Sequence, residues 1–374
     1  MMETREYKKM SIDRKTARQL ETFTPEEMLK YCEHRIQGQG KELKKAVYMI
    51  YQYLQCVAKG ETFNADNWFL TGISGSGKTE FFRVIRDFFK LYDIPIPVVQ
   101  IDLSNITETG FKGAEPTSIP KRIIEENPNT KGVGICFLDE ADKKCIASYS
   151  SNNVNVNAAV QANLLTMIEG KKFVDDDMPD FDSGLTMFVF IGAFQELRNR
   201  KKKIIKNNGS IGFETNFDKA VKNEISSYFQ DELTLQEMIE FGLMEELAGR
   251  MVQVINFHRL SEKDMLTLIK CKVKEIAKAM DVNIEITKQA ANEFLSISFG
   301  DLGVRCPMNK IRELTQNKIS EVFFENGFNP ATNKVVIDSL HSARIKRIYT
   351  NRNAICKNNE RTDFNEEDNI FCKE

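Results

Sequence analysis

The chain has 374 residues, of which 41% are hydrophobic and 28% are charged, the ordinary proportions of a globular protein in water. Its formal net charge of −2 provides no global attraction to nucleic acid or to anionic membranes. The longest apolar run, residues 187–194, is too short to cross a bilayer, and the first residues lack the apolar core of a secretory signal. The 8 cysteines include no C-x-x-C pair, which argues against a zinc site and favours the reducing cytoplasm.

The first helix signal lies close to the N-terminus. Residues 24–27 (Thr-Pro-Glu-Glu) have the composition of a capping box, which predicts a helix start at that point. Residues 1–23 are accordingly expected to form an N-terminal extension.

A complete phosphate-loop pattern, G-x-x-x-x-G-K-[ST], follows the apolar run at residues 68–70. Its members are Gly72, Ile73, Ser74, Gly75, Ser76, Gly77, Lys78 and Thr79. The run before it predicts a buried strand, and residues 80–89 have the pattern of an amphipathic helix. At such a turn, backbone N–H groups and the helix dipole can hold phosphates, with Lys78 on the β- and γ-phosphates and the Thr79 hydroxyl on Mg²⁺. We therefore expect a nucleoside-triphosphate site, against the alternative of a glycine-rich turn with an incidental lysine.

A second acidic element completes the expected site. Residues 133–140 form an apolar run that ends in Asp139 and Glu140, and a buried parallel strand would present both carboxylates at its C-terminal end. Asp139 is predicted to lie on the Mg²⁺ side, and Glu140 to polarise the attacking water. Residues 97–103 and 185–192 are further strand patterns, so the expected fold is α/β with a parallel sheet flanked by helices.

These motifs, and others across residues 24–338, resemble the AAA+ ATPases of the Clp/Hsp100 type, in particular the ATP-binding subunits of Clp proteases. Residues 35–39 (Arg-Ile-Gln-Gly-Gln) are similar to the family's adenine-contacting stretch, which implies that Ile36 contacts the nucleotide. Residues 161–170 match a family helix almost position for position. The resemblance implies an AAA+ large domain that binds ATP and Mg²⁺, followed by a small, mostly helical domain.

The resemblance also implies an arginine finger. Residues 241–250 (Phe-Gly-Leu-Met-Glu-Glu-Leu-Ala-Gly-Arg) resemble the family box whose last residue, here Arg250, enters a neighbouring subunit's site. A planar, permanently charged donor can stabilise charge that develops on the γ-phosphate. The plain alternative for Arg250 is a surface salt bridge.

Two loops of the family bind other proteins, and both have counterparts here. Residues 107–113 resemble the segment with the aromatic pore loop, which assigns substrate gripping to Gly110, Phe111, Lys112 and Gly113. Residues 211–213 match the I-G-F loop that docks on a ClpP-type peptidase, which assigns docking to Ile211, Gly212 and Phe213. The basic run at 198–206 is expected to be a solvated loop, and its lack of interleaved aromatic residues argues against nucleic-acid binding.

Four segments are predicted along the chain. They are the extension at 1–23, a large α/β domain at 24–257, a small domain at 261–345 with strands near 282–286 and 334–338, and a charged tail at 346–374. A hinge is expected at 256–260. In the small domain, Leu302 occupies the position of the family's nucleotide-sensing arginine, and only the second arginine remains, as Arg305.

The first hypothesis is a cytoplasmic, ATP-driven homo-oligomeric ring, expected to be a hexamer. It would thread unfolded or tagged protein substrates into a ClpP-type peptidase. The alternative is a non-proteolytic remodelling chaperone that uses the same motor. A third reading, a regulatory subunit with impaired hydrolysis, rests on Leu302 and is opposed by the intact Lys78, Asp139, Glu140 and Arg250. The family's zinc-binding domain is expected to be missing, since residues 1–23 lack its cysteines.

Overall fold

A computed structural model describes residues 14–22, 24–60, 63–106, 118–149, 153–175, 178–208, 232–298 and 305–348. The chain divides into two compact units, Met1–Leu260 and Ser261–Glu374, which are described separately below. Within the described ranges, no helix combines the length and the apolar character that crossing a membrane requires.

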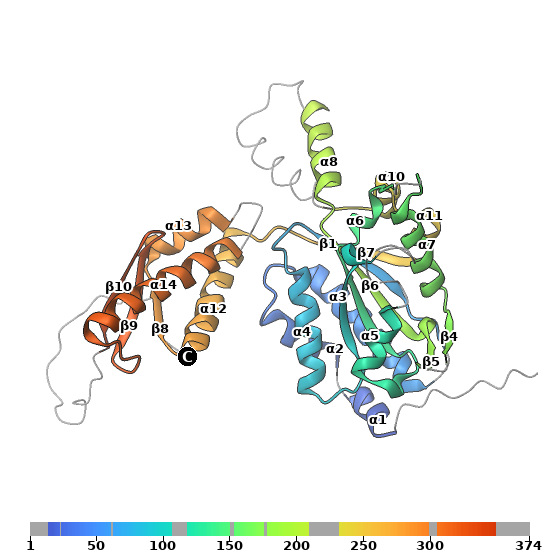
Figure 1. The fold of residues 1–374 in the computed structure, drawn as a ribbon, viewed down its shortest axis with the longest axis horizontal. Coiled ribbons are helices and arrows are strands. Elements are labelled where there is room, and N and C mark those ends of the chain that lie inside the picture. Colours follow the sequence, from blue (N-terminus) through green and yellow to red (C-terminus); the bar gives the residue numbers. More distant parts are fainter. Residues whose placement is uncertain are drawn as a thin grey trace, which may run out of the picture. The chain divides into compact units, whose positions relative to one another are not determined.

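The first unit is built on a five-stranded sheet in the order β2-β3-β6-β1-β7, and every neighbouring pair is parallel. Figure 1 shows this sheet among the helices of the unit, with β1, β6 and β7 labelled. Its strands are β1 (Asn67–Gly72), β2 (Val98–Asp102), β3 (Gly134–Asp139), β6 (Thr186–Gly192) and β7 (Met251–Phe257). The central strands β1 and β6 are buried along their whole length, as parallel strands covered on both faces must be. The predicted α/β fold with a parallel sheet is therefore confirmed.

Successive side chains of each strand enter two separate cores. In β1, Trp68 and Leu70 join the core on one face, while Phe69 joins the core on the other. The first core is closed by α1 (Arg14–Thr22), α2 (Pro25–Glu33), α3 (Gly40–Lys59) and α4 (Lys78–Leu91). The second is closed by α5 (Ser118–Glu126), α6 (Asp142–Cys145), α7 (Val156–Ile168), α10 (Leu235–Phe241) and α11 (Glu245–Ala248).

Local sequence signals explain where several helices begin and end. The predicted capping box is present at α2, where the Thr24 hydroxyl accepts from the Glu27 N–H and the Glu27 carboxylate accepts from the Thr24 N–H. Thr234 and Glu237 form a second capping box at α10. Helix α3 ends at Gly60, which has the left-handed conformation common at helix ends.

Smaller elements connect the layers of the first unit. Strands β4 (Lys172–Asp175) and β5 (Met178–Asp182) pair as an antiparallel hairpin, and α8 (Gln195–Asn208) follows β6 directly. Three short 3₁₀ turns precede or follow strands, namely η1 (Leu103–Asn105), η2 (Pro128–Thr130) and η3 (Ser183–Leu185).

In its described residues, the second unit packs three helices with a small sheet. Its helices are α12 (Glu262–Met280), α13 (Lys288–Ser298) and α14 (Arg305–Asn326), and its strands are β8 (Asn283–Ile286), β9 (Asn333–Ser339) and β10 (Ser342–Arg347). The sheet order is β10-β9-β8, with β9 antiparallel to β10 and parallel to β8. Strand β10 was not anticipated from the sequence, and it continues to Arg347, past the predicted start of the tail at residue 346.

One buried hydroxyl joins helix α3 to the starts of two strands. Tyr53 is fully buried, and its hydroxyl lies 2.9 Å from the Gly134 carbonyl oxygen and 2.8 Å from that of Leu185. The same hydroxyl accepts from the Gly134 N–H at 2.8 Å. Burial raises the pKa of Tyr53, so the hydroxyl stays protonated and can donate.

Tyr53→Phe should lower the free energy of unfolding of the first unit by about 1–3 kcal/mol, because it leaves buried backbone groups without their partner. Trp68 is the single tryptophan of the chain and is buried in this unit, so its fluorescence in a urea titration reports the transition. Tyr48→Phe, at a residue that is 49% exposed, is the matched control and should change little. Equal midpoints for the two variants would contradict the role given to the Tyr53 hydroxyl.

Candidate active site

Three neighbouring strands end together and bring the predicted catalytic residues to one edge of the sheet. β1 ends at Gly72, β3 ends at Asp139 and β6 ends at Gly192, and the registers Thr71↔Gly192 and Leu138↔Phe190 keep these ends level. The carboxyl edge of an open parallel sheet is where such folds bind ligands. The phosphate loop, Asp139 and Glu140 therefore share one site.

The predicted phosphate loop joins β1 to α4, as the sequence pattern requires. Gly77 is the N-cap of α4 and has φ +103°, a conformation that a residue with a side chain rarely adopts. The loop closes on itself through the Ser76 N–H, which donates to the Ile73 carbonyl at 3.3 Å. Ile36 is buried, and its side chain lies 3.6 Å from the position that a Cβ on Gly77 would occupy, so the stretch at 35–39 lines this loop.

Lys78 is the buried cation of the loop. Only 9% of this residue is exposed, and its Nζ donates to the carbonyls of Gly72 and Ile73 at 2.6 and 2.9 Å. Burial is the main cause that lowers its pKa to about 8, and the nearby guanidinium of Arg198 acts in the same direction. An anion in the loop would stabilise the charged amine and offset this desolvation.

The two acidic residues differ in their surroundings. Asp139 accepts from Gln100 Nε2 at 2.6 Å and from the Glu140 N–H at 2.9 Å, so both of its oxygens are oriented. Glu140 has φ +58° and is exposed at the end of the strand. Its partial burial and then the neighbouring carboxylates of Asp142 and Asp139 raise its pKa. A carboxylate with a raised pKa is the more effective proton acceptor of the two.

A buried polar network lies directly behind the loop. Arg198 is fully buried, and it donates through Nη2 to Thr71 Oγ1 and through Nε to the Ala193 carbonyl, both at 2.9 Å. Thr71 Oγ1 donates to Asn256 Oδ1 at 2.7 Å, so α8, β1 and β7 are held together one residue before Gly72. The expected solvated loop at 198–206 is therefore wrong, since these residues belong to helix α8 and Arg198 is fully buried. Helical spacing places Arg198 four residues after the buried Phe194, but this spacing does not identify the partners of the guanidinium.

Gln39 forms a second link between the loop and β7. Its Nε2 donates to the carbonyls of Ser76 and His258, and its Oε1 accepts from the His258 N–H at 2.8 Å. Gln39 is buried and belongs to the family-like stretch at 35–39. It thereby connects the phosphate loop to the first residue after β7.

The residues present fit a nucleoside triphosphate with Mg²⁺. Within the described residues, Ser76 Oγ and Asp142 Oδ1 are buried polar atoms without a hydrogen-bond partner, and both belong to the loop or to the turn after Asp139. The loop offers the Lys78 cation at a helix N-terminus, where anions are favoured. Thr79 follows Lys78 in α4 and is half-buried, and with Asp139 it provides the oxygen ligands that Mg²⁺ prefers.

Arg250 is not part of this edge. It directly precedes β7, whose first residue Met251 pairs with Asn67, so it lies at the amino edge of the sheet, opposite Gly72. A strand of 7 residues separates the two edges by about 20 Å. Arg250 is exposed there and pairs with Glu169, with 2.6 Å between Nη2 and Oε1. The salt bridge weighed as the alternative therefore exists within one subunit.

Several predicted residues cannot be compared with the structure. The pore-loop residues 110–113, the docking residues 211–213 and residue 302 lie outside the described residues. Arg305 is the first residue of α14 in the second unit. The roles assigned to these residues stay predictions.

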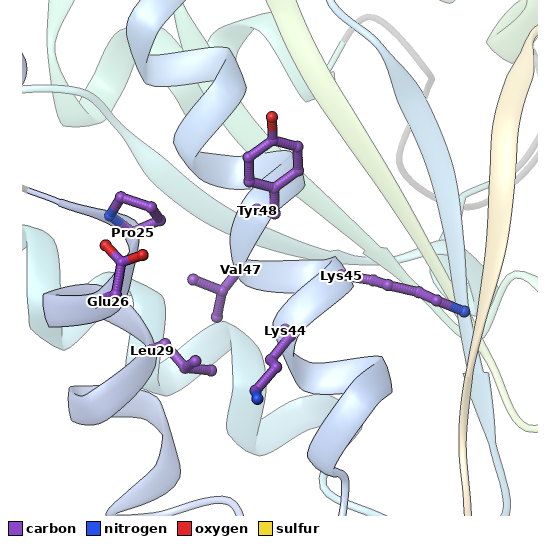
Figure 2. A pocket seen from close by; sticks show the side chains of 7 residues that line it. All are labelled: Pro25, Glu26, Leu29, Lys44, Lys45, Val47 and Tyr48. Atoms are coloured by element: carbon purple, nitrogen blue, oxygen red, sulfur yellow. The ribbon is translucent and has the colours of Figure 1, made fainter.

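A groove of about 430 Å³ lies between α2 and α3, away from the phosphate loop (Figure 2). Leu29 of α2 and Val47 of α3 face each other across it, and Pro25, Glu26, Lys44, Lys45 and Tyr48 complete its lining. None of these residues belongs to the site at the sheet edge. The groove is therefore a separate surface feature of the first unit.

Comparison with known proteins agrees with this geometry. Residues 68–212 match the family described as "ATPase family associated with various cellular activities (AAA)". The chain is similar to the "ATP-dependent Clp protease ATP-binding subunit ClpX" of Treponema denticola, with 23% identity over 86% of this chain and 77% of that protein. The subunits of the same name from Borrelia duttonii and Borrelia recurrentis are each 27% identical over 66% of this chain, which spans 60% of their length.

The lowered pKa of Lys78 predicts a pH dependence of ATP binding. Below about pH 8 the Lys78 amine of the unliganded protein is already protonated, and the affinity for ATP should be nearly constant. Above about pH 8 the amine must take up a proton when ATP binds, and the affinity should fall by up to about tenfold per pH unit. Lys78→Arg is the matched control, because its guanidinium stays charged and its affinity should not change with pH. Titration with a fluorescent ATP analogue from pH 7 to about 9.5 measures both. A flat profile for the parental chain would refute the role given to Lys78.

Proposed function

We propose that this chain, whose residues 68–212 form an ATPase domain of the AAA family, is a subunit of a ring that hydrolyses ATP to unfold proteins. The ring is a homo-oligomer in which each site is completed by the next subunit. Its substrates are unfolded or tagged proteins, and a ClpP-type peptidase receives them.

The position of Arg250 is the observation that carries the ring proposal. The finger precedes β7 at the amino edge of the sheet, about 20 Å from the phosphate loop at the carboxyl edge of the same subunit. A guanidinium on a long side chain does not cover that distance. If Arg250 stabilises the γ-phosphate, it does so in the site of a neighbour, and hydrolysis then depends on assembly.

The chain's own residues divide the chemistry between binding and turnover. Lys78 and the N–H groups of the loop bind the phosphates, and Thr79 with Asp139 would hold Mg²⁺. Ile36 lies against the loop, where it would contact the adenine of the nucleotide. When bound, Mg²⁺ neutralises charge on the β- and γ-phosphates. Glu140 orients the attacking water and accepts its proton, since its carboxylate is exposed at the strand end and has a raised pKa.

The names of the relatives support a link between ATP binding and a protease. Each of the three is called an ATP-binding subunit of an ATP-dependent Clp protease. The pore-loop residues 110–113 and the docking residues 211–213 provide the corresponding contacts in this proposal. A remodelling chaperone without a peptidase is the second candidate, and the Ile-Gly-Phe sequence at 211–213 favours the first.

Subunit mixing tests the motor. Glu140→Gln should bind ATP and lose turnover by at least about a hundredfold, because it removes the base and leaves the phosphate contacts intact. Arg250→Ala should lose turnover on a similar scale, and Lys78→Ala should lose binding itself. Mixing Glu140→Gln with Arg250→Ala subunits should restore part of the ATPase rate, since each variant supplies the half that the other lacks. Parental turnover in Glu140→Gln, or no gain in well-mixed rings, would contradict these assignments.

Phe213→Ala tests the peptidase partner. Burying a phenylalanine in a partner's pocket contributes about 1.5–3 kcal/mol per site, and several sites on one ring act together. The variant should keep its ATPase rate and melting temperature while degradation of a tagged substrate with a ClpP-type peptidase collapses. A joint fall of melting temperature and ATPase rate would mean that Phe213 packs inside its own subunit. Unchanged degradation would favour the remodelling chaperone.

A further inference from the structure

Helix α7 contacts two segments that the proposed reaction uses, one after Glu140 and one at Arg250. Its residue Gln161 contacts the turn that follows Glu140, and Glu169, at its C-cap, contacts Arg250. The two positions are eight residues apart along the helix, a rise of about 12 Å. One helix therefore contacts both the segment after the base and the side chain of the finger.

Gln161 is buried and uses one amide to join two segments that are distant in sequence. Its Nε2 donates to the carbonyls of Lys144 at 2.9 Å and Gly242 at 3.1 Å, and its Oε1 accepts from the Met244 N–H at 2.7 Å. Only 5% of Gln161 is exposed, so water does not replace these bonds. The amide fixes the backbone on both sides of residue 243.

Close packing against α6 also restricts the position of this backbone. Gly242 has φ +120°, and a Cβ on it would lie 2.0 Å from the Cys145 carbonyl oxygen. The segment thus lies directly on the end of α6, the helix that follows Glu140. Cys145 blocks a shift of Gly242 towards α6, and the hydrogen bond from Gln161 opposes a shift away from α6.

A single short helix links the fixed backbone to Arg250. Met244 is the N-cap of α11, and its carbonyl accepts from the Ala248 N–H at 2.9 Å. The Arg250 N–H then donates to the Leu247 carbonyl at 3.2 Å. No loop intervenes between Met244 and the finger, so the direction of α11 sets the origin of the Arg250 side chain.

Glu169 holds the other end of the same assembly. Its Oε1 accepts from Arg250 Nη2 at 2.6 Å and from Nε at 3.2 Å. An exposed pair of this kind contributes little to stability, so its effect is on the rotamer of the arginine. Holding one rotamer lowers the entropy that the finger loses when it enters a neighbouring site.

We infer that Gln161 and Glu169 are positioning residues, which act through Arg250 and hold it in the orientation that a neighbouring subunit's nucleotide requires. This inference rests on the proposed function, because it presumes a finger that acts in trans. Gln161 sets the backbone from which the finger projects, and Glu169 sets its side chain. Both effects belong to the subunit that donates the finger.

Gln161→Met keeps the length of the side chain and removes all three hydrogen bonds. The ATPase kcat of the full chain should fall by about tenfold or more, with the dissociation constant for ATP within about twofold of the parent. Gln289→Met, the same change at an exposed glutamine of α13, is the control and should leave both values unchanged. A parental kcat in a folded Gln161→Met protein would overturn the inference, as would a loss confined to ATP binding.

Mixed rings separate a defect in the finger from a defect in the base. Subunits with Gln161→Met should regain activity when mixed with Glu140→Gln subunits, which donate an intact finger to an intact base. They should gain nothing with Arg250→Ala subunits, because every finger is then defective. The reverse pattern would show that Gln161 acts on the base of its own subunit, and would overturn the inference.

The reference mixture distinguishes failure of this inference from failure of the proposed function. If Glu140→Gln and Arg250→Ala subunits restore one another while Gln161→Met follows the wrong pattern, only the inference fails. If the reference mixture shows no gain, the trans finger fails and the inference fails with it.

Two further variants keep the test valid if Gln161→Met does not fold. Gln161→Glu keeps the acceptor for the Met244 N–H and, when protonated, can donate to one carbonyl, so its rate relative to the parent should rise as pH is lowered. Glu169→Gln changes an exposed residue, and it should lower kcat by about two- to tenfold with the melting temperature unchanged. If the ATPase rate of Gln161→Glu relative to the parent does not change with pH, the role given to Gln161 is wrong. If Glu169→Gln has the parental kcat, the role given to Glu169 is wrong.

Discussion

The site depends on the level ends of three parallel strands. β1, β3 and β6 are paired so that Gly72, Asp139 and Gly192 stop at one edge, where β1 leads into the phosphate loop and β3 ends in Asp139. A slip of one residue in any pairing would turn every side chain of that strand to the opposite core. The two aromatic-rich cores on the faces of the sheet therefore fix the catalytic geometry as well as the stability of the fold.

Burial of charge behind the phosphate loop is the second constraint, and it connects the loop to other parts of the unit. The guanidinium of Arg198 is fully buried, and its bond to Thr71 continues through Asn256 into β7. Gln39 binds both Ser76 of the loop and His258, the residue after β7. Hydrogen bonds therefore connect the loop to the end of β7, close to Leu260, where the first unit ends.

The fold could be predicted where a local sequence pattern is typical of a single structural element. The continuous apolar runs predicted β1, β3 and β6, and the capping box predicted the start of α2. β7 was missed because only its last three residues are continuously buried, and part of it was interpreted as a hinge. The contacts of Arg198 and Gln161 join segments far apart in the chain, so no local spacing could reveal them.

The short helix α6 contacts three segments to which different functions are proposed. It begins at Asp142, two residues after Glu140, and its Lys144 carbonyl accepts from Gln161, whose amide also binds Gly242 and Met244 in the segment before Arg250. The Lys144 side chain is buried and donates 2.7 Å to the Ile106 carbonyl, and Ile106 is the last described residue before the segment at 107–117 that contains the predicted pore loop. Burial lowers the pKa of Lys144, and the negative charge of Asp102 acts in the opposite direction. One turn of helix thus contacts the residue proposed as the base, the segment that precedes Arg250, and Ile106, the last described residue before the predicted pore loop.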